Sequence, residues 1–202
     1  ELLRWKYQRF AKNYLRCIQD VDENIGRFRS FYNQFSKQEC IFIYTANQGR
    51  FIGENGWFGN QWMMESTMRI PLSFTYINSA NTTHRKIEQN IQDIDLAPTI
   101  LSLASCDNFE NNHGISLNLE DWNSTILNKR KELYFHHYDF PGSLMVAKHY
   151  GIRTPAYKLT HYYQFGEWEL FDFRSEQAES KNILSSFNEV EKLKTSLIKI
   201  QS

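Results

Sequence analysis

The sequence predicts an α/β fold in two parts, and three observations lead to this prediction. A long amphipathic stripe precedes a short run of strand-forming residues near the N-terminus. Four short, aromatic-rich runs follow one another in the last third, and a second amphipathic stripe closes the chain. We therefore expect part of a mixed sheet with flanking helices over residues 1–125. A small α+β subdomain of four antiparallel strands and one helix should cover residues 126–202.

The first predicted helix is defined by seven apolar residues whose spacing alternates between four and three. These residues are Tyr14, Ile18, Val21, Ile25, Phe28, Tyr32 and Phe35. Gly26 lies within the stripe and predicts the close approach of a neighbouring segment. Residues 41–45 are bulky and strand-forming, so they predict a buried strand that forms half of a parallel α/β layer with the helix.

A polar, glycine-rich loop over residues 46–60 follows this strand and is the best candidate for a site. Ligands of open α/β sheets bind at the carboxyl ends of strands, where this loop begins. Residues 71–77 predict another strand. Residues 95–104 predict a helix with Asp95 as its cap and Pro98 in its first turn.

The last third predicts strands at residues 133–138, 145–153, 157–163 and 168–173, each bounded by turn residues. Apolar residues recur at helical spacing from Ile183 to Ile200, which predicts one closing helix.

Composition excludes several classes of protein. The 202 residues contain 23 Lys and Arg against 23 Asp and Glu, whereas binding to nucleic acid phosphates favours a basic excess. No apolar run is long enough for a transmembrane helix, and the first residues lack the apolar core of a signal peptide. The three cysteines form no CxxC pair, so we expect buried free thiols rather than a zinc or redox motif.

Several stretches, in the same order along the chain, resemble the C-terminal half of type I sulfatases of the alkaline phosphatase superfamily. They are residues 14–27 (YLRCIQDVDENIGR), 43–49 (IYTANQG), 53–60 (GENGWFGN), 68–72 (MRIPL), 90–99 (NIQDIDLAPT), 149–154 (HYGIRT) and 167–172 (EWELFD). The resemblance is nearest to bacterial enzymes that act on sulfated glycans, similar to N-acetylglucosamine-6-sulfatases and sulfoglucosamine sulfohydrolases.

This resemblance implies calcium-dependent hydrolysis of sulfate esters on glycans. In the family, a Cys or Ser within a C/S-x-P-x-R motif becomes the formylglycine nucleophile, and calcium polarises the sulfate. No such motif occurs in these 202 residues, so we expect no turnover from this chain alone.

The site positions that the resemblance implies also depart from the family pattern. Asn47 and Gln48 stand where the family has an Asp-Gln pair of metal ligands, and the lost charge should weaken calcium binding. Among the catalytic positions, Asn60 replaces an expected Lys and Asn55 replaces an expected His. The alternative interpretation of these asparagines is that of ordinary turn residues.

Two residues of the last third are candidates for substrate binding. His149 matches a family position that faces the substrate, although a single His on a strand is often structural. Arg153 could pair with a sulfate or carboxylate, or form a structural ion pair. Arg69 lies four residues after Glu65, and this spacing predicts a simple helical pair.

Three functional interpretations therefore stay open. The chain could be the structural part of an active sulfatase, a degenerate homologue that binds sulfated glycan without cleaving it, or a scaffold. A sulfated glycan is the expected ligand. An N-terminal sulfatase half or a second copy is the expected protein partner, because an incomplete sheet exposes unpaired backbone and apolar surface. The resemblance implies a periplasmic or extracellular location.

Overall fold

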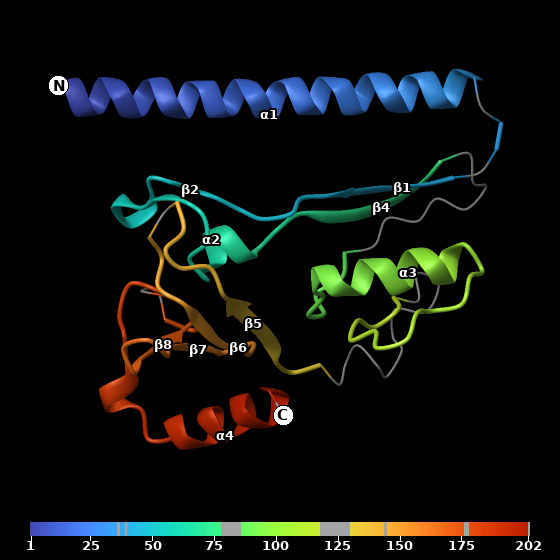
Figure 1. Cartoon of the computed structure of the whole chain (residues 1–202). Helices are drawn as coiled ribbons and strands as arrows, with labels where there is room; N and C mark the ends of the chain where they lie inside the picture. The colour runs from blue at the N-terminus through green and yellow to red at the C-terminus, as the bar shows by residue number, and fades with distance from the viewer. Residues whose placement is uncertain are drawn as a thin grey trace.

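The computed structural model describes residues 1–35, 37–38, 40–77, 86–117, 130–143, 145–175 and 178–201. A long helix lies along one side of a two-stranded ribbon, and a four-stranded sheet with a closing helix lies on the other side (Figure 1). The predicted boundary at residues 125 and 126 lies outside the described residues, so the division into 1–125 and 126–202 stays a prediction.

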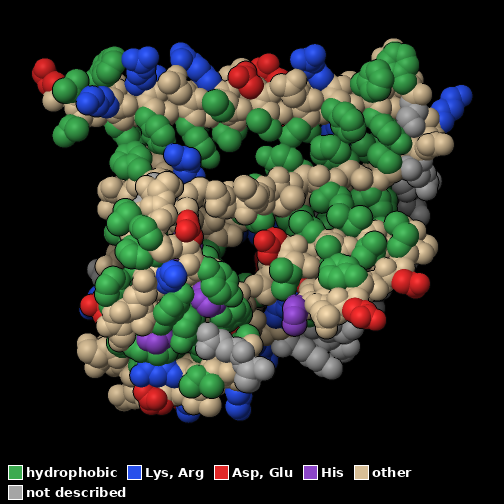
Figure 2. All heavy atoms as spheres, in the orientation of Figure 1, with side chains coloured by type: hydrophobic (Ala, Val, Ile, Leu, Met, Phe, Trp, Pro, Cys, Tyr) green, Lys and Arg blue, Asp and Glu red, His purple; other side chains and the backbone are tan. Residues whose placement is uncertain are grey.

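The first helix, α1 (Leu2–Phe35), begins well before the predicted stripe and has no buried residue. Aromatic contacts join it to the strands, with ring centroids 5.6 Å apart between Phe10 and Phe58 and 5.5 Å apart between Phe28 and Phe42. Apolar side chains cover the side of α1 that faces the ribbon (Figure 2). The predicted close approach at Gly26 is wrong, because no neighbouring segment of the described chain lies within 4 Å of a Cβ placed there.

The strand after α1, β1 (Cys40–Thr45), pairs with β4 (Leu72–Ile77), and this pair is antiparallel. The prediction of a parallel layer is therefore wrong for the described chain. The side chains of β1 are half-buried or exposed rather than buried, because the ribbon has only two strands. A short hairpin of β2 (Phe51–Ile52) and β3 (Phe58–Gly59) and the one-turn helix α2 (Glu65–Met68) lie between them in sequence.

The predicted four-stranded antiparallel sheet is confirmed, in the order β5-β6-β7-β8. Its strands are β5 (Leu133–His137), β6 (His149–Arg153), β7 (Tyr157–Tyr162) and β8 (Glu167–Asp172). Alternation along the strands gives the sheet two different faces. Ile152, Leu159 and Leu170 occupy one face, and His149, Arg153 and Lys158 occupy the other.

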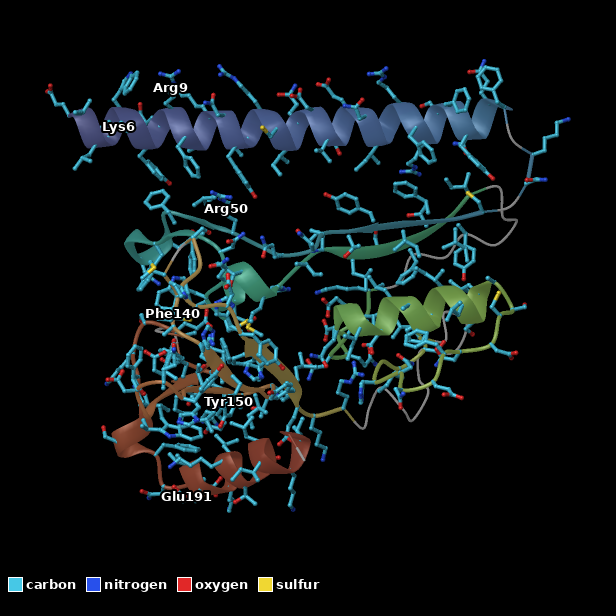
Figure 3. The ribbon with its side chains drawn as sticks, viewed as in Figure 1. Lys6, Arg9, Arg50, Phe140, Tyr150 and Glu191 are labelled. Carbon is cyan, nitrogen blue, oxygen red and sulfur yellow. The ribbon has the colours of Figure 1, made fainter. Side chains whose placement is uncertain are left out.

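The closing helix, α4 (Val190–Gln201), covers the apolar face of this sheet. Val190 and Leu197 pack against the three central apolar residues, and Figure 3 shows Tyr150 on the same side of the sheet. The predicted single helix from residue 183 is wrong at its start. A 3-10 turn at Leu184–Ser186 comes first, and the extended backbone of Phe187 separates it from α4.

The helix α3 (Leu96–Leu103) is close to its predicted bounds, and Asp95 occupies the N-cap position as predicted. The Asp95 side chain makes no cap hydrogen bond to α3. It is completely buried, forms an ion pair with Arg130, and accepts hydrogen bonds from the backbone N–H groups of Gln92 and Ile115 at 2.9 and 2.7 Å. Asp95 therefore joins three segments of the chain.

A buried charge pair connects the four-stranded sheet to the segment around α2. Lys158 is completely buried, pairs with Glu179, and donates a hydrogen bond from Nζ to the backbone oxygen of Met63 at 2.6 Å. The Glu179 carboxylate accepts the backbone N–H of Glu65 at 2.9 and 3.1 Å. The residues just after Asn60 are thus held against the polar face of the sheet.

Two findings complete the fold. All three cysteines are free thiols as predicted, but Cys17 and Cys106 are exposed and Cys40 is half-buried, so their predicted burial is wrong. Within the part of the chain that the structure describes, no helix is both long and apolar enough to cross a membrane.

Candidate functional site

A broad groove of about 2280 Å³ separates the two-stranded ribbon from the four-stranded sheet. Consecutive residues of β4 line one side and consecutive residues of β5 line the other, and Figure 2 shows the hollow between these parts. Typical small-molecule pockets measure about 300–1,000 Å³. The groove is therefore large enough for an extended ligand or for a further segment of polypeptide.

Asn47 and Gln48 lie at this groove, directly after β1, and both are exposed. The next residue fixes their position. Gly49 donates its backbone N–H to the oxygen of Thr67 at 2.7 Å, and a Cβ at Gly49 would lie 2.2 Å from the oxygen of Ser66. Only glycine fits against α2 at this distance, so the loop after β1 is pressed onto α2.

Asn55 and Asn60 are not among the described residues that line the groove. Asn55 is exposed in the turn between β2 and β3, where its backbone is left-handed with φ of 53°. Asparagine adopts this conformation more readily than most residues, so the turn itself explains the residue type. Asn60 is half-buried, and the next residue, Gln61, reaches the groove. The family roles of Asn55 and Asn60 stay predictions.

Arg153 reaches the groove, where it already has several partners. Its Nε lies 3.1 Å from the Glu65 carboxylate, and its guanidinium lies 4.1 Å from the centre of the Phe173 ring. It also donates to the backbone oxygen of Thr154. This geometry is that of a structural ion pair, and contact between Arg153 and substrate stays a prediction.

Arg69 is a candidate site residue that the sequence did not indicate, because its spacing from Glu65 predicted a structural pair. The predicted pair between Arg69 and Glu65 is wrong, because the Glu65 carboxylate pairs with Arg153. Arg69 lines the groove, is exposed, and has no ion pair among the described residues. Three other cations of the groove, Lys86, Arg130 and Arg153, are each paired with a carboxylate. Only the structure reveals this difference.

His149 is completely buried at the start of β6, opposite His137 of β5. Its Nδ1 lies 2.7 Å from the backbone oxygen of Ala147. Burial is the main cause that lowers the pKa of His149 to about 4, and the nearby positive charges of His137 and Lys158 add to it. The ring is therefore neutral at pH 7, with its proton on Nδ1 and a lone pair on Nε2.

Several buried polar atoms near this strand pair lack a hydrogen-bond partner among the described residues. They are Nε2 of His149, Nε2 of His137, Nε2 of His136 and Oε1 of Gln61. An unsatisfied buried polar atom costs about 1–3 kcal/mol. A water or a ligand group that donates a proton to the Nε2 of His149 would relieve part of this cost.

The pKa of His149 predicts a pH-dependent stability. The unfolded chain protonates this residue near pH 6.5 and the folded chain only near pH 4. The unfolded state therefore binds more protons between these values, and stability falls as the pH is lowered through them. We expect His149 to account for a loss of about 2–3 kcal/mol between pH 7.5 and pH 4.

Urea unfolding of the parent chain, His149→Gln and His113→Gln at several pH values measures this effect. His113 is exposed, so its variant should keep the full pH dependence. A His149→Gln variant with the same pH dependence as the parent would contradict the assignment.

The described residues do not make a calcium site by themselves. Asn47 and Gln48 offer neutral amide oxygens, whereas calcium sites rely on several oxygens that include carboxylates. Within the described chain, no group of three or more His, Cys, Asp or Glu side chains is arranged to hold a metal ion. The predicted metal role of Asn47 and Gln48 therefore needs ligands from outside the described residues.

Comparison with known proteins identifies the family of this chain. A family model described as N-sulphoglucosamine sulphohydrolase, C-terminal, matches residues 53–202. The chain belongs to this sulfatase family. The resemblance in the sequence is thereby confirmed, and the matched residues of this sulfatase chain include both the Gly53–Asn60 stretch and the whole four-stranded sheet.

Relatives of this sulfatase chain agree. An N-acetylglucosamine-6-O-sulfatase of Bacteroides thetaiotaomicron is 37% identical over 199 residues, which cover 96% of this chain and 35% of the relative. An arylsulfatase of Clostridium perfringens is 27% identical over a match that covers 86% of this chain and 35% of the arylsulfatase. The chain thus spans about a third of the length of these curated relatives.

Solved structures confirm the fold class of the sulfatase chain. The structure of BT4656 in complex with its substrate D-glucosamine-2-N,6-O-disulfate matches with a TM-score of 0.81 and 32% identity, over 99% of this chain and 42% of that chain. The sulfatase yidJ from Bacteroides fragilis matches with a TM-score of 0.74 and 25% identity, over 94% and 42% of the two chains. The mixed α/β architecture with its antiparallel sheet is therefore that of the C-terminal region of sulfatases.

Proposed function

We propose that this chain is the sugar-recognising part of a glycan sulfatase-family protein, and that these 202 residues bind a sulfated glycan without hydrolysing it. Hydrolysis in the family requires a formylglycine nucleophile, and its C/S-x-P-x-R motif does not occur in the chain. The names of the relatives, which refer to sulfated glucosamines, support this class of ligand. Calcium stays a family expectation, since Asn47 and Gln48 alone do not hold it.

The observation that carries the proposal is that Arg69 lines the groove and has no ion-pair partner within the described part of the chain. A sulfate group has only acceptor oxygens, so it needs donors and positive charge. Arg69 is the groove cation that can supply both without first breaking an ion pair among the described residues. The amide groups of Asn47 and Gln48 lie at the same groove and can donate to a hydroxyl or sulfate oxygen.

His149 suits a different part of the ligand. Because its pKa is lowered to about 4, its Nε2 accepts rather than donates a proton at neutral pH. A sulfate oxygen is also an acceptor and cannot donate a hydrogen bond to this Nε2, whereas a sugar hydroxyl or amine can. In this proposal Arg69 recognises the sulfate. His149 is completely buried and is not among the residues that line the groove, so its contact with the glycan stays a prediction.

Replacing Arg69 with glutamine tests the proposal. Hydrogen bonds to charged groups contribute about 1.5–3 kcal/mol, so Arg69→Gln should weaken the binding of a heparin-derived tetrasaccharide by about 10- to 100-fold. Binding of the fully desulfated tetrasaccharide should not change. Isothermal titration at fixed ionic strength measures both.

The matched control is Arg50→Gln. Arg50 is also exposed, does not line the groove, and lies on the side of the ribbon that faces α1 in Figure 3. Equal losses in the two variants would indicate unspecific attraction of an anion and would contradict a site in the groove.

One observation favours an interaction module as the second candidate function. Large apolar side chains on α1 remain exposed, including Ile18, Val21, Phe28 and Phe31. An apolar surface of this kind marks an interface in many proteins. The expected occupants are an N-terminal sulfatase half or a second copy of the chain. A monodisperse monomer at high concentration, measured by light scattering, would argue against the second copy.

A further inference from the structure

Two tyrosines whose rings contact the groove residue His136 lead us to an inference that rests on the proposed function and extends it. We propose that Tyr138 and Tyr163 form a stacking site for a second sugar ring of the glycan. Tyr138 follows the end of β5, and Tyr163 follows the end of β7. Both lie at the same end of the four-stranded sheet, where β6 begins.

The two tyrosines belong to one cluster centred on His136. The Tyr138 ring stacks on the His136 ring with centroids 3.6 Å apart, and the Tyr163 ring meets His136 edge-on at 5.7 Å. Tyr163 also stacks on Tyr150 at 5.6 Å. His136 itself is fixed by a hydrogen bond of 2.9 Å between its Nδ1 and the hydroxyl of Tyr134.

These contacts hold exposed rings in place. Tyr138 is 68% exposed and Tyr163 is 37% exposed, although both rings rest on inner rings of the cluster. An exposed aromatic ring that is already ordered loses little conformational freedom when a ligand binds. Phe109 is also exposed, at 52%, but its ring contacts no other aromatic ring among the described residues. The order of the two tyrosines distinguishes them from an ordinary exposed aromatic residue.

The position of the cluster indicates a sugar as the ligand. His136 and Tyr134 line the groove that also contains Arg69, Asn47 and Gln48. The two outer tyrosines do not line it themselves, so they border the proposed sulfated-glycan site through His136. Tyrosine offers an apolar ring face and a hydroxyl, and a pyranose offers an apolar C–H face bordered by hydroxyls. A glycan that passes His136 in the groove can place its next ring on the Tyr138 ring, which stacks on His136.

The test compares ligands of different length. The double variant Tyr138→Ala, Tyr163→Ala should bind a heparin-derived tetrasaccharide about tenfold more weakly than the parent chain. Its affinity for the single sugar D-glucosamine-2-N,6-O-disulfate should not change, because one ring occupies only the groove. The variant Tyr138→Phe, Tyr163→Phe keeps both rings and should stay within about twofold of the parent. Phe109→Ala is the control for loss of an exposed ring elsewhere.

The outcomes separate the inference from the proposed function. Unchanged tetrasaccharide affinity in the alanine variant, together with a loss in Arg69→Gln, overturns the tyrosine site and leaves the proposed function standing. An equal loss for the tetrasaccharide and the single sugar also overturns it, since this indicates a general structural effect. If the parent chain binds neither ligand, both proposals fail. Thermal unfolding and circular dichroism establish that each variant is folded.

Discussion

Replacing Asp95 with alanine is expected to destabilise the folded chain by about 3–5 kcal/mol. The Asp95 carboxylate is completely buried and pairs with Arg130, whose side chain is only 10% exposed. The substitution leaves this guanidinium buried without its counter-charge, which costs more than the loss of the pair itself. It also removes the acceptor for the backbone N–H groups of Gln92 and Ile115.

Urea unfolding measures the loss, and Asp93→Asn is the matched control. Asp93 is exposed, two residues away, and its replacement should change stability by less than about 0.5 kcal/mol. A loss below about 1 kcal/mol in Asp95→Ala would contradict the claim that this carboxylate joins three segments.

A second large effect is expected at Lys158. The variant Lys158→Met keeps the volume of the aliphatic stem but leaves the Glu179 carboxylate, which is 13% exposed, without its positive partner. It also removes the donor to the backbone oxygen of Met63. We expect a destabilisation of about 3–5 kcal/mol, measured by urea unfolding.

The double variant Lys158→Met, Glu179→Gln shows whether the pair is the cause. Glutamine is neutral and can still accept the backbone N–H of Glu65, so the double variant should be more stable than Lys158→Met alone. Lys192→Met provides the control, because Lys192 and Glu189 form an exposed pair of the kind that contributes under about 1 kcal/mol. If the loss of stability in the double variant equals the sum of the losses in Lys158→Met and Glu179→Gln, the two residues do not act as a coupled pair.

The fold follows from the sequence where local patterns are sufficient. The four strands of the last third are short aromatic runs between turn residues, and the structure places a strand in each run. The start of α4 was misplaced because Ile183 and Phe187 continue the helical spacing, although they pack against the core from outside the helix. Helical spacing of apolar residues indicates which residues are buried. It does not show whether they all belong to one helix.

Contacts between distant residues could not be predicted in this way. The partner of β1 is β4, about 30 residues later, and nothing in residues 41–45 specifies an antiparallel neighbour. Asp95 has the residue type of a helix cap, but it pairs with Arg130, 35 residues away. Arg69 has the spacing of a helical pair with Glu65, but the Glu65 carboxylate pairs with Arg153, which lies 88 residues after Glu65.

The candidate site, like the fold, could be predicted from the sequence only in part. The glycine-rich loop after a strand contains Asn47 and Gln48, which lie at the groove, and their role as ligands stays a prediction. Sequence alone did not reveal that His149 is completely buried or that Tyr138 and Tyr163 share one cluster. Burial and ring stacking depend on the register between strands, which a single sequence does not specify.

The most direct test of the account is to titrate the purified chain with a heparin-derived tetrasaccharide and its desulfated counterpart, each with calcium and with a chelator. Recognition by Arg69 predicts that the sulfated ligand binds at least tenfold more tightly than the desulfated one, without release of product. It also predicts little change when calcium is removed, because Asn47 and Gln48 alone do not hold the ion. Equal affinities for the two ligands, or no binding of either, would contradict a role in recognising sulfated glycans.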